Sequence, residues 1–123
     1  MRNKVLAYAK ETYGTEPEYL WERYPDCAVL RRRDNRKWYG IIMTVKRCKL
    51  GLEGGENADV LNVKIGETGL RDALIDNRGI FRAYHMAAGT WVSIILDGTV
   101  DMKEISDLMD ISYLAVADKR KTK

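Results

Sequence analysis

The amino-acid sequence predicts an α+β fold in which an antiparallel sheet has helices packed on one face. Apolar residues recur with helical spacing near both ends of the chain, and between these segments they mostly alternate with a period of two. The predicted order is a helix, two or three strands, a short helix, one or two strands and a long helix. This order lacks the strand–helix–strand alternation of a doubly wound parallel sheet.

The first predicted helix covers residues 3–13. Val5 and Ala9 lie four residues apart, so they share one side of a helix. Asn3 is the predicted N-cap because a short polar side chain there can accept a bond from a free backbone N–H. Gly14 is expected to end the helix in a left-handed turn.

Two further helices are predicted later in the chain. Residues 68–78 form a short helix that Gly79 is expected to stop. Residues 101–117 form a longer one, in which Asp101 and Glu104 have the spacing of a capping box. Apolar residues on one side of this last helix are expected to face the core.

The predicted strands are short and follow one another closely. They cover residues 27–32, 37–46, 59–65 and 90–96, with an edge strand or connector at 80–86. Asp34 and Asn35 favour a turn between the first two strands, which are therefore expected to pair antiparallel. The period of two places one set of side chains on a common face of the second strand: Tyr39, Ile41, Met43 and Val45.

Length and composition fit one small domain. We expect residues 1–117 to form it and the basic residues 118–123 to be a disordered tail. No apolar run reaches the roughly 20 residues that a membrane span requires, and no secretory signal is evident. Cys27 and Cys48 are too few for a disulfide framework, so a cytoplasmic location is expected.

Positive charge is concentrated in residues 27–50. This segment has a net charge of +7, which leaves −4 for the remainder of a chain whose total is +3. Such asymmetry is informative about binding partners. The segment's acidic residue is Asp34, and its basic residues are Arg31, Arg32, Arg33, Arg36, Lys37, Lys46, Arg47 and Lys49.

The basic hairpin is the first candidate site, and its expected partner is DNA. Clustered Lys and Arg bind phosphates mainly by releasing counterions. Trp38 and Tyr39 add aromatic surface on which the bases of a single strand could stack. The hypothesis requires the positive side chains to form one continuous outward surface. The alternative is that they only protect an edge strand from aggregation.

Several short strings of residues occur together in a fixed order along the chain. They are Lys37-Trp38-Tyr39, Leu61-Asn62-Val63-Lys64, Phe81-Arg82-Ala83-Tyr84-His85-Met86, Trp91-Val92-Ser93 and Ser112-Tyr113-Leu114. This series resembles the MmcQ/YjbR family of small bacterial proteins over roughly residues 3–117. The resemblance implies a CyaY-like architecture, described as a double wing with two helices across one face of an antiparallel sheet. It also implies the DNA-binding role predicted for that family.

A polar and aromatic cluster is the second candidate site. Lys64 is expected to project from one strand near Tyr84, His85 and Trp91, and together they could bind an anion or nucleotide. The alternative is structural, with Tyr84 and His85 hydrogen-bonded to the sheet.

Catalytic and metal-binding patterns are weak. Ser93, His85 and Asp97 could be arranged as a triad, but Ser93 falls inside a strand rather than on the sharp turn of a nucleophile elbow. One histidine and two distant cysteines match no zinc spacing. We therefore expect no enzymatic activity, no metal and no cofactor.

The leading hypothesis is an accessory DNA-binding protein that contacts phosphates through Arg31, Arg33, Arg36 and Lys37. In the rival hypothesis the chain is an adaptor for a protein or a small ligand, bound around Lys64, Tyr84, His85 and Trp91.

Overall fold

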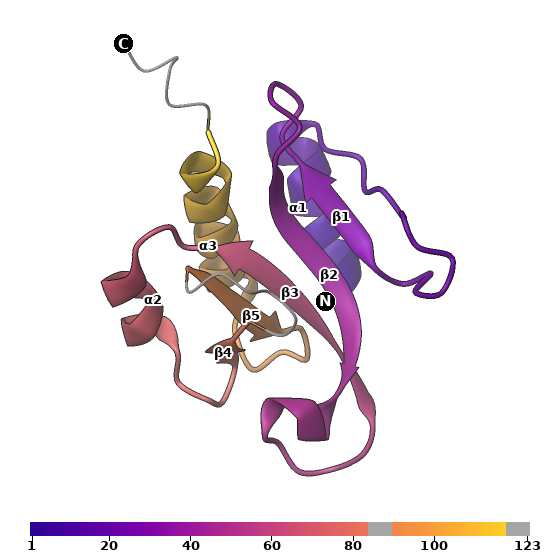
Figure 1. Cartoon of the computed structure of the whole chain (residues 1–123), viewed down its shortest axis with the longest axis vertical. Helices are drawn as coiled ribbons and strands as arrows, with labels where there is room; N and C mark the ends of the chain where they lie inside the picture. The colour runs from indigo at the N-terminus through magenta and orange to yellow at the C-terminus, as the bar shows by residue number, and fades with distance from the viewer. Residues whose placement is uncertain (84–89, 118–123) are drawn as a thin grey trace.

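Five antiparallel strands form one sheet, in the order β1-β2-β3-β5-β4 (Figure 1). In this computed structural model, residues 1–83 and 90–117 are described. The strands are β1 (Ala28–Arg31), β2 (Trp38–Lys46), β3 (Asn57–Lys64), β4 (Ile80–Arg82) and β5 (Trp91–Ile95). The helices are α1 (Arg2–Tyr13), the short 3-10 helix η1 (Arg47–Leu50), α2 (Thr68–Leu74) and α3 (Met102–Ala115). The predicted α+β class with an antiparallel sheet is confirmed.

The long helices α1 and α3 pack side by side on the same face of the sheet (Figure 1). Val5 and Ala9 of α1, together with Ile105 and Met109 of α3, are buried against apolar side chains of the strands. This arrangement leaves a second face without either long helix, which we call the helix-free face. A smaller apolar cluster of Cys27, Val29 and Ile41 lies apart from the main core.

The helix ends partly follow the predictions. Gly14 closes α1 in the left-handed region with φ 70°, and the Asp101 carboxylate accepts a hydrogen bond from the Glu104 backbone N–H at the start of α3. The Asn3 cap is wrong, because α1 begins one residue earlier and its cap position is Met1.

The helix α2 is shorter than expected. It ends at Leu74, whereas the sequence suggested residue 78. The Asp76 carboxylate accepts bonds from the backbone N–H groups of Arg78, Gly79 and Ile80. These bonds stabilise a turn that competes with further helix.

A bulge in β2 overturns the expected alternation of side chains. Leu30 pairs with Gly40, but the next residue, Arg31, pairs with Trp38, so Tyr39 is an extra residue in β2. Tyr39 therefore lies in the main core under the helices, whereas Ile41 belongs to the smaller cluster. The prediction that both share one face is wrong because the period of two is interrupted between them.

The predicted turn between β1 and β2 is present at residues 33–35. The residue that follows it, Arg36, has a positive φ of 64°. The Asn35 side chain accepts a bond from the Lys37 N–H and donates one to the carbonyl of Val116. The turn is thus attached to the end of α3.

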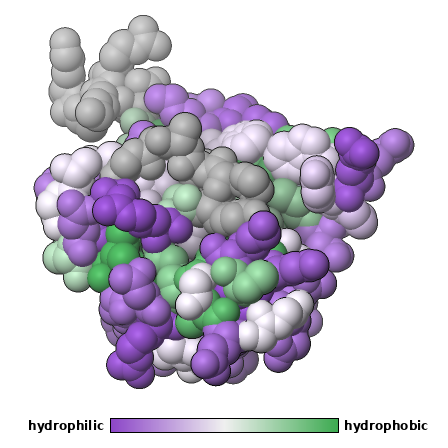
Figure 2. All heavy atoms as spheres, turned by 60° about the horizontal axis from the view of Figure 1, so that its bottom comes forward, coloured by the Kyte–Doolittle hydropathy of each residue, from purple (hydrophilic) through white to green (hydrophobic). Residues whose placement is uncertain are grey.

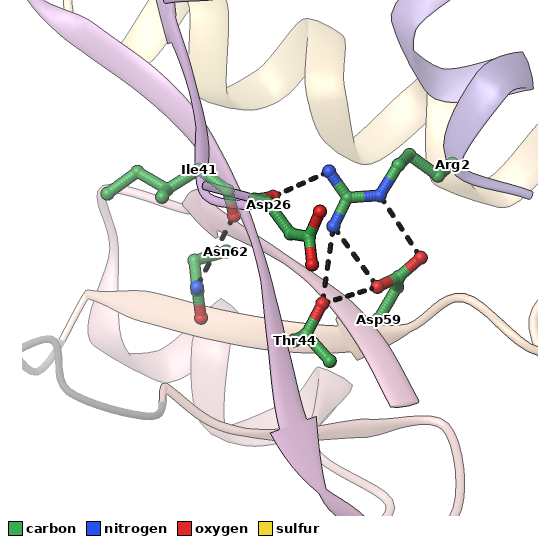
Figure 3. Close-up of polar contacts among 6 residues, drawn as sticks. All are labelled: Arg2, Asp26, Ile41, Thr44, Asp59 and Asn62. Atoms are coloured by element: carbon green, nitrogen blue, oxygen red, sulfur yellow. Dashed lines mark hydrogen bonds and ion pairs between the residues drawn. The ribbon is translucent and has the colours of Figure 1, made fainter. Parts of the chain in front are cut away.

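At the opposite end of the sheet, Arg2 attaches α1 to the strands (Figure 3). Its guanidinium donates two hydrogen bonds of 3.1 Å to the Asp59 carboxylate and one of 2.6 Å to the Asp26 carbonyl. Thr44 donates a further bond to the same carboxylate. The hydrogen bond from Arg2 lowers the pKa of Asp59 below its usual value.

Candidate nucleic-acid interface

The eight predicted cations form two separate groups. Figure 1 shows the β1–β2 turn at one end of the sheet and η1 at the other. Between them β2 runs for nine residues, which is about 27 Å of extended chain. We call the first set the tip group: Arg31, Arg32, Arg33, Arg36 and Lys37. We call the second set the base group: Lys46, Arg47 and Lys49. The single continuous positive surface assumed from the sequence is therefore not formed.

Within the tip group, Glu18 neutralises part of the charge. Its carboxylate accepts a 2.7 Å hydrogen bond from Arg36, and it lies 3.2 Å from Arg31 Nε, where the orientation does not complete a hydrogen bond. Arg33 lies against the chain at Gly14. These three arginines line a cavity of about 250 Å³ beside residues 14–18.

Arg32 is committed to the fold. Its guanidinium donates two bonds to the Asp34 carboxylate and one of 2.8 Å to the Tyr113 carbonyl of α3. It also lies over the Tyr113 ring, 4.0 Å from the centroid. The hydrogen bond from Arg32 lowers the pKa of Asp34 to about 2, so this carboxylate stays ionised at neutral pH. Arg32 is therefore not free to contact a phosphate.

The lysines of both groups are less restricted. Lys37, Lys46 and Lys49 have exposed side chains, and none is ion-paired with a carboxylate in the part of the chain that the structure describes. Arg47 differs, because it lies 3.4 Å from an Asp97 carboxylate oxygen and donates to the Glu53 carbonyl. The three lysines are thus well placed to meet an anionic partner, as is the exposed Arg33, which has no carboxylate partner among the described residues.

Aromatic side chains lie between the two groups. The Trp21 and Trp38 rings meet edge to face with centroids 6.0 Å apart, and the Arg31 guanidinium lies 5.5 Å from the Trp38 centroid. Trp21 and Tyr24 are 38% and 64% exposed. Both belong to the connector between α1 and β1, and Trp38 packs against the small cluster that contains Ile41. We call Trp21, Trp38 and Tyr24 the aromatic surface.

The second candidate site is described only in part. Lys64 of β3 and Trp91 of β5 are directly opposite each other in the sheet. The pair two positions along the same two strands is Asn62 and Ser93, which are both buried. The Ser93 hydroxyl donates a hydrogen bond to the Asn62 side-chain oxygen. Trp91 is 8% exposed, so it offers little surface. The predicted partners Tyr84 and His85 lie outside the described residues, as does the predicted tail at 118–123.

The residues considered for catalysis and metal binding can be placed in part. Ser93 is buried in the middle of β5, as expected from the sequence. Across residues 1–83 and 90–117, no group of three or more His, Cys, Asp or Glu side chains is arranged to hold a metal ion. Cys27 and Cys48 are both free thiols. Among the helices in these ranges, none combines the length and apolar character needed to cross a bilayer.

Sequence reasoning missed two features of this interface. It did not assign Glu18 as the partner of Arg31 and Arg36, because that contact depends on an isolated bridge that brings Glu18 beside Val29. It also left the connector aromatics without a role. Their concentration between Pro17 and Pro25, in a segment with no strand or helix pattern, was the available signal for exposed aromatic surface.

Comparison with known proteins places this geometry in a family. The model of the YjbR family matches residues 10–115. The chain is 42% identical over 112 residues to the uncharacterized protein YyaQ of Bacillus subtilis (strain 168), with 91% of this chain and 94% of that protein covered.

Solved structures show the same fold. A crystal structure of a Pseudomonas syringae protein superposes with a TM-score of 0.90 at 35% identity, covering 95% of this chain and 99% of the other. A solution NMR structure from that organism gives a TM-score of 0.82 at 36% identity, with 93% and 90% covered. A Deinococcus radiodurans protein with a DUF419 domain shares the fold alone, with a TM-score of 0.68 at 21% identity and coverage of 98% and 80%.

The resemblance inferred from the short sequence strings is therefore confirmed at the level of the family. The further likeness to the CyaY architecture stays a prediction. On the match to the family model and the extended identity to YyaQ, this chain belongs to the YjbR family.

Proposed function

We propose that this protein is an accessory DNA-binding protein, without catalytic activity, that holds single strands on the helix-free side of the β1–β2 hairpin. The observation that carries the proposal is the aromatic surface between the two groups of cations, in which Trp21 and Tyr24 are exposed and Trp38 is partly buried. Bases would stack on the rings, and the phosphates would lie near Lys37 at one end and near Lys46 and Lys49 at the other.

The charge pairing argues for weak binding that tolerates any sequence. Arg31, Arg32 and Arg36 are already close to carboxylates, so they add less positive potential than their number suggests. The three lysines and the exposed Arg33, which have no carboxylate partners among the described residues, would dominate counterion release. Stacking adds affinity without reading the base sequence, because every base offers an aromatic face.

Fluorescence anisotropy of a labelled oligothymidylate across a salt series tests this proposal. Substituting Lys37, Lys46 and Lys49 together by Gln should weaken binding and flatten the slope of log K against log salt by about 2, since each phosphate contact on a single strand contributes about 0.7. Duplex DNA of equal length should bind more weakly than the single strand.

A control of equal formal charge is available on the helical face. Lys4, Lys10 and Lys103 are exposed residues of α1 and α3, of which Lys10 pairs with Glu16 and Lys103 with Asp107. Replacing all three by Gln removes three formal charges from the other side of the molecule. The control should leave the salt slope close to that of the unmodified protein. Equal effects of the two triple variants, or no binding at low salt, would contradict the proposal.

The adaptor hypothesis keeps one favourable observation. Lys64 and Trp91 lie opposite each other in the sheet, beside the buried pair of Asn62 and Ser93. Buried polar side chains are therefore present in this part of the helix-free face. Addition of nucleotides or inorganic phosphate should then shift the Trp91 indole N–H signal in an NMR spectrum. Spectra that do not change at Trp91 across such a panel would count against it.

A further inference from the structure

A cleft opens at the base of the β1–β2 hairpin, beyond the aromatic pair of Trp21 and Trp38. Its volume is about 470 Å³, which lies within the range of about 300–1,000 Å³ typical of small-molecule sites. It is lined by Tyr24, Cys27, Met43, Thr44, Val45, Lys46, Lys49 and Asn57. Figure 2, turned toward this end of the molecule, shows hydrophobic side chains set among hydrophilic ones.

The floor of the cleft is apolar. Cys27 and Val45 are 8% and 7% exposed, and Met43 is half-buried against the small cluster of Val29 and Ile41. Burial raises the pKa of the Cys27 thiol, so this residue contributes a neutral surface at neutral pH. Such a floor favours a flat hydrocarbon or ring system over a hydrated ion.

The rim of the cleft is positive and carries hydrogen-bond donors. Lys46 and Lys49 are exposed, and none of the described residues that line the cleft is acidic. The Tyr24 side chain, 64% exposed, and the exposed Asn57 amide add groups that can donate hydrogen bonds. Two ammonium groups above an apolar floor match a molecule with one anionic end and one apolar end.

The wall that carries Cys27 is held in place from outside the cleft. Arg2 donates to the carbonyl of Asp26, the residue before Cys27, while it also binds Asp59 of β3 (Figure 3). Asp59 in turn accepts a bond from Thr44, a residue of the cleft. The protein's own charged hydrogen bonds thus hold the residues of the cleft in place before a ligand binds. Less conformational entropy is therefore lost on binding.

We propose that this cleft binds a small amphipathic anion, in which a flat ring system lies on Met43 and Cys27 and a carboxylate or phosphate group meets Lys46 and Lys49. The ligand chemistry has two possible sources, a nucleotide or a free aromatic acid. The inference goes beyond strand binding and does not depend on it, because a small anion needs neither Lys37 nor the Trp21–Trp38 pair.

NMR titration with a matched pair of probes tests the inference. 2-Naphthoate has an apolar ring system and a carboxylate, whereas 2-naphthylmethanol has the same rings without the charge. The 2-naphthoate titration should shift the Met43 methyl signal in a saturable manner and leave the Met109 methyl, buried in the main core, unchanged. The neutral probe should bind at least five-fold more weakly. A parallel titration with adenosine monophosphate distinguishes the two possible classes of ligand. If adenosine monophosphate binds more tightly than 2-naphthoate, the ligand is a nucleotide rather than a free aromatic acid.

Two controls keep the test specific. Replacing Lys46 and Lys49 by Gln should weaken 2-naphthoate binding about ten-fold, whereas Lys37→Gln, just before the far end of β2, should not change it. Bound 2-naphthoate should also slow alkylation of Cys27 and leave the exposed Cys48 unaffected. An unshifted Met43 signal, or equal affinity for the charged and neutral probes, would overturn the inference even if oligothymidylate still binds. If the protein binds 2-naphthoate as expected but does not bind oligothymidylate, the inference of a cleft for a small anion still holds.

Discussion

At the scale of single residues, the structure divides the arginines of the hairpin by the work they do. Arg32 joins the β1–β2 turn to α3, through its bond to the Tyr113 carbonyl and its contact with the Tyr113 ring. Arg33, one residue further along, is exposed and lies beside Gly14. Adjacent residues of the same type thus have different roles, which the sequence pattern did not distinguish.

Arg32→Lys should lower the free energy of unfolding by about 1–3 kcal/mol, because an ammonium group cannot reproduce the paired bonds to Asp34 together with the contact on Tyr113. Arg33→Lys is the matched control and should stay within about 0.5 kcal/mol of the unmodified protein. Urea unfolding followed by circular dichroism measures both. Equal stability of the two variants would show that the Arg32 contacts contribute nothing.

Asp59 supplies a prediction on pH dependence. Its folded-state pKa is lowered by the Arg2 hydrogen bond, so its contribution to stability is present above the unfolded value of 3.8 and is lost as the pH falls below it. Asp59→Asn should therefore cost about 1–2 kcal/mol at pH 7. The difference in the free energy of unfolding between this variant and the unmodified protein, measured by urea unfolding, should become smaller as the pH approaches 3. A difference that is constant with pH would exclude the ion pair as its cause.

At the scale of the elements, some helix ends were predicted correctly, whereas the face on which Tyr39 of β2 lies was not. The Asp101 cap of α3 follows from local sequence, because a cap needs only residues a few positions apart. The bulge at Tyr39 does not, since it depends on how β1 and β2 pair. The extra residue turns Tyr39 toward α1 and α3, where its hydroxyl donates to Thr15.

Asp101→Ala should destabilise the protein by about 1 kcal/mol through loss of the N-cap bond. Asp107→Ala, in the exposed part of the same helix, removes an equal charge and breaks only a surface pair with Lys103, so its effect should stay below about 0.5 kcal/mol. Thermal unfolding compares the two variants. The account of the cap is contradicted if Asp107→Ala is the more damaging change.

At the scale of the whole molecule, the sequence allowed prediction of the fold class, the family and most elements, but not the shape of the charged surface. The basic residues are close in sequence, yet a strand of nine residues carries Lys46 and Lys49 away from the tip group. Glu18 reaches Arg31 and Arg36 only because the connector folds back beside β1. Both effects depend on distances in space, which residue spacing alone does not give.

A cluster of phenols joins α1, β2 and α3 into one unit, and it predicts sensitivity to alkali. The Tyr13 ring stacks on Tyr113 at 4.0 Å between centroids and meets Tyr39 edge to face. Burial raises the pKa of Tyr39 to about 12, and burial together with the hydrogen bond to Asp110 raises the pKa of Tyr13 well above its ordinary 10. The stability from the neutral phenols is thus present below pH 10.

The free energy of unfolding should fall as the pH rises from 10 to 12, because the unfolded chain loses these phenolic protons more readily than the folded one. Substituting Tyr13 and Tyr39 by Phe should flatten the fall, whereas the same change at the exposed Tyr19 and Tyr24 should preserve it. Urea unfolding across this pH range provides the measurement. A fall that is unchanged in the Tyr13 and Tyr39 variant would assign the alkaline sensitivity to other groups.

The three tryptophans of the chain can test the proposed binding of nucleic acid on the helix-free side of the β1–β2 hairpin. Trp21 and Trp38 belong to the aromatic surface, whereas Trp91 lies in β5 next to Lys64. Titration with oligothymidylate, followed through the three indole N–H signals in an NMR spectrum, should shift Trp21 and Trp38 and leave Trp91 in place. A shift confined to Trp91, or no shift at all, would contradict the account.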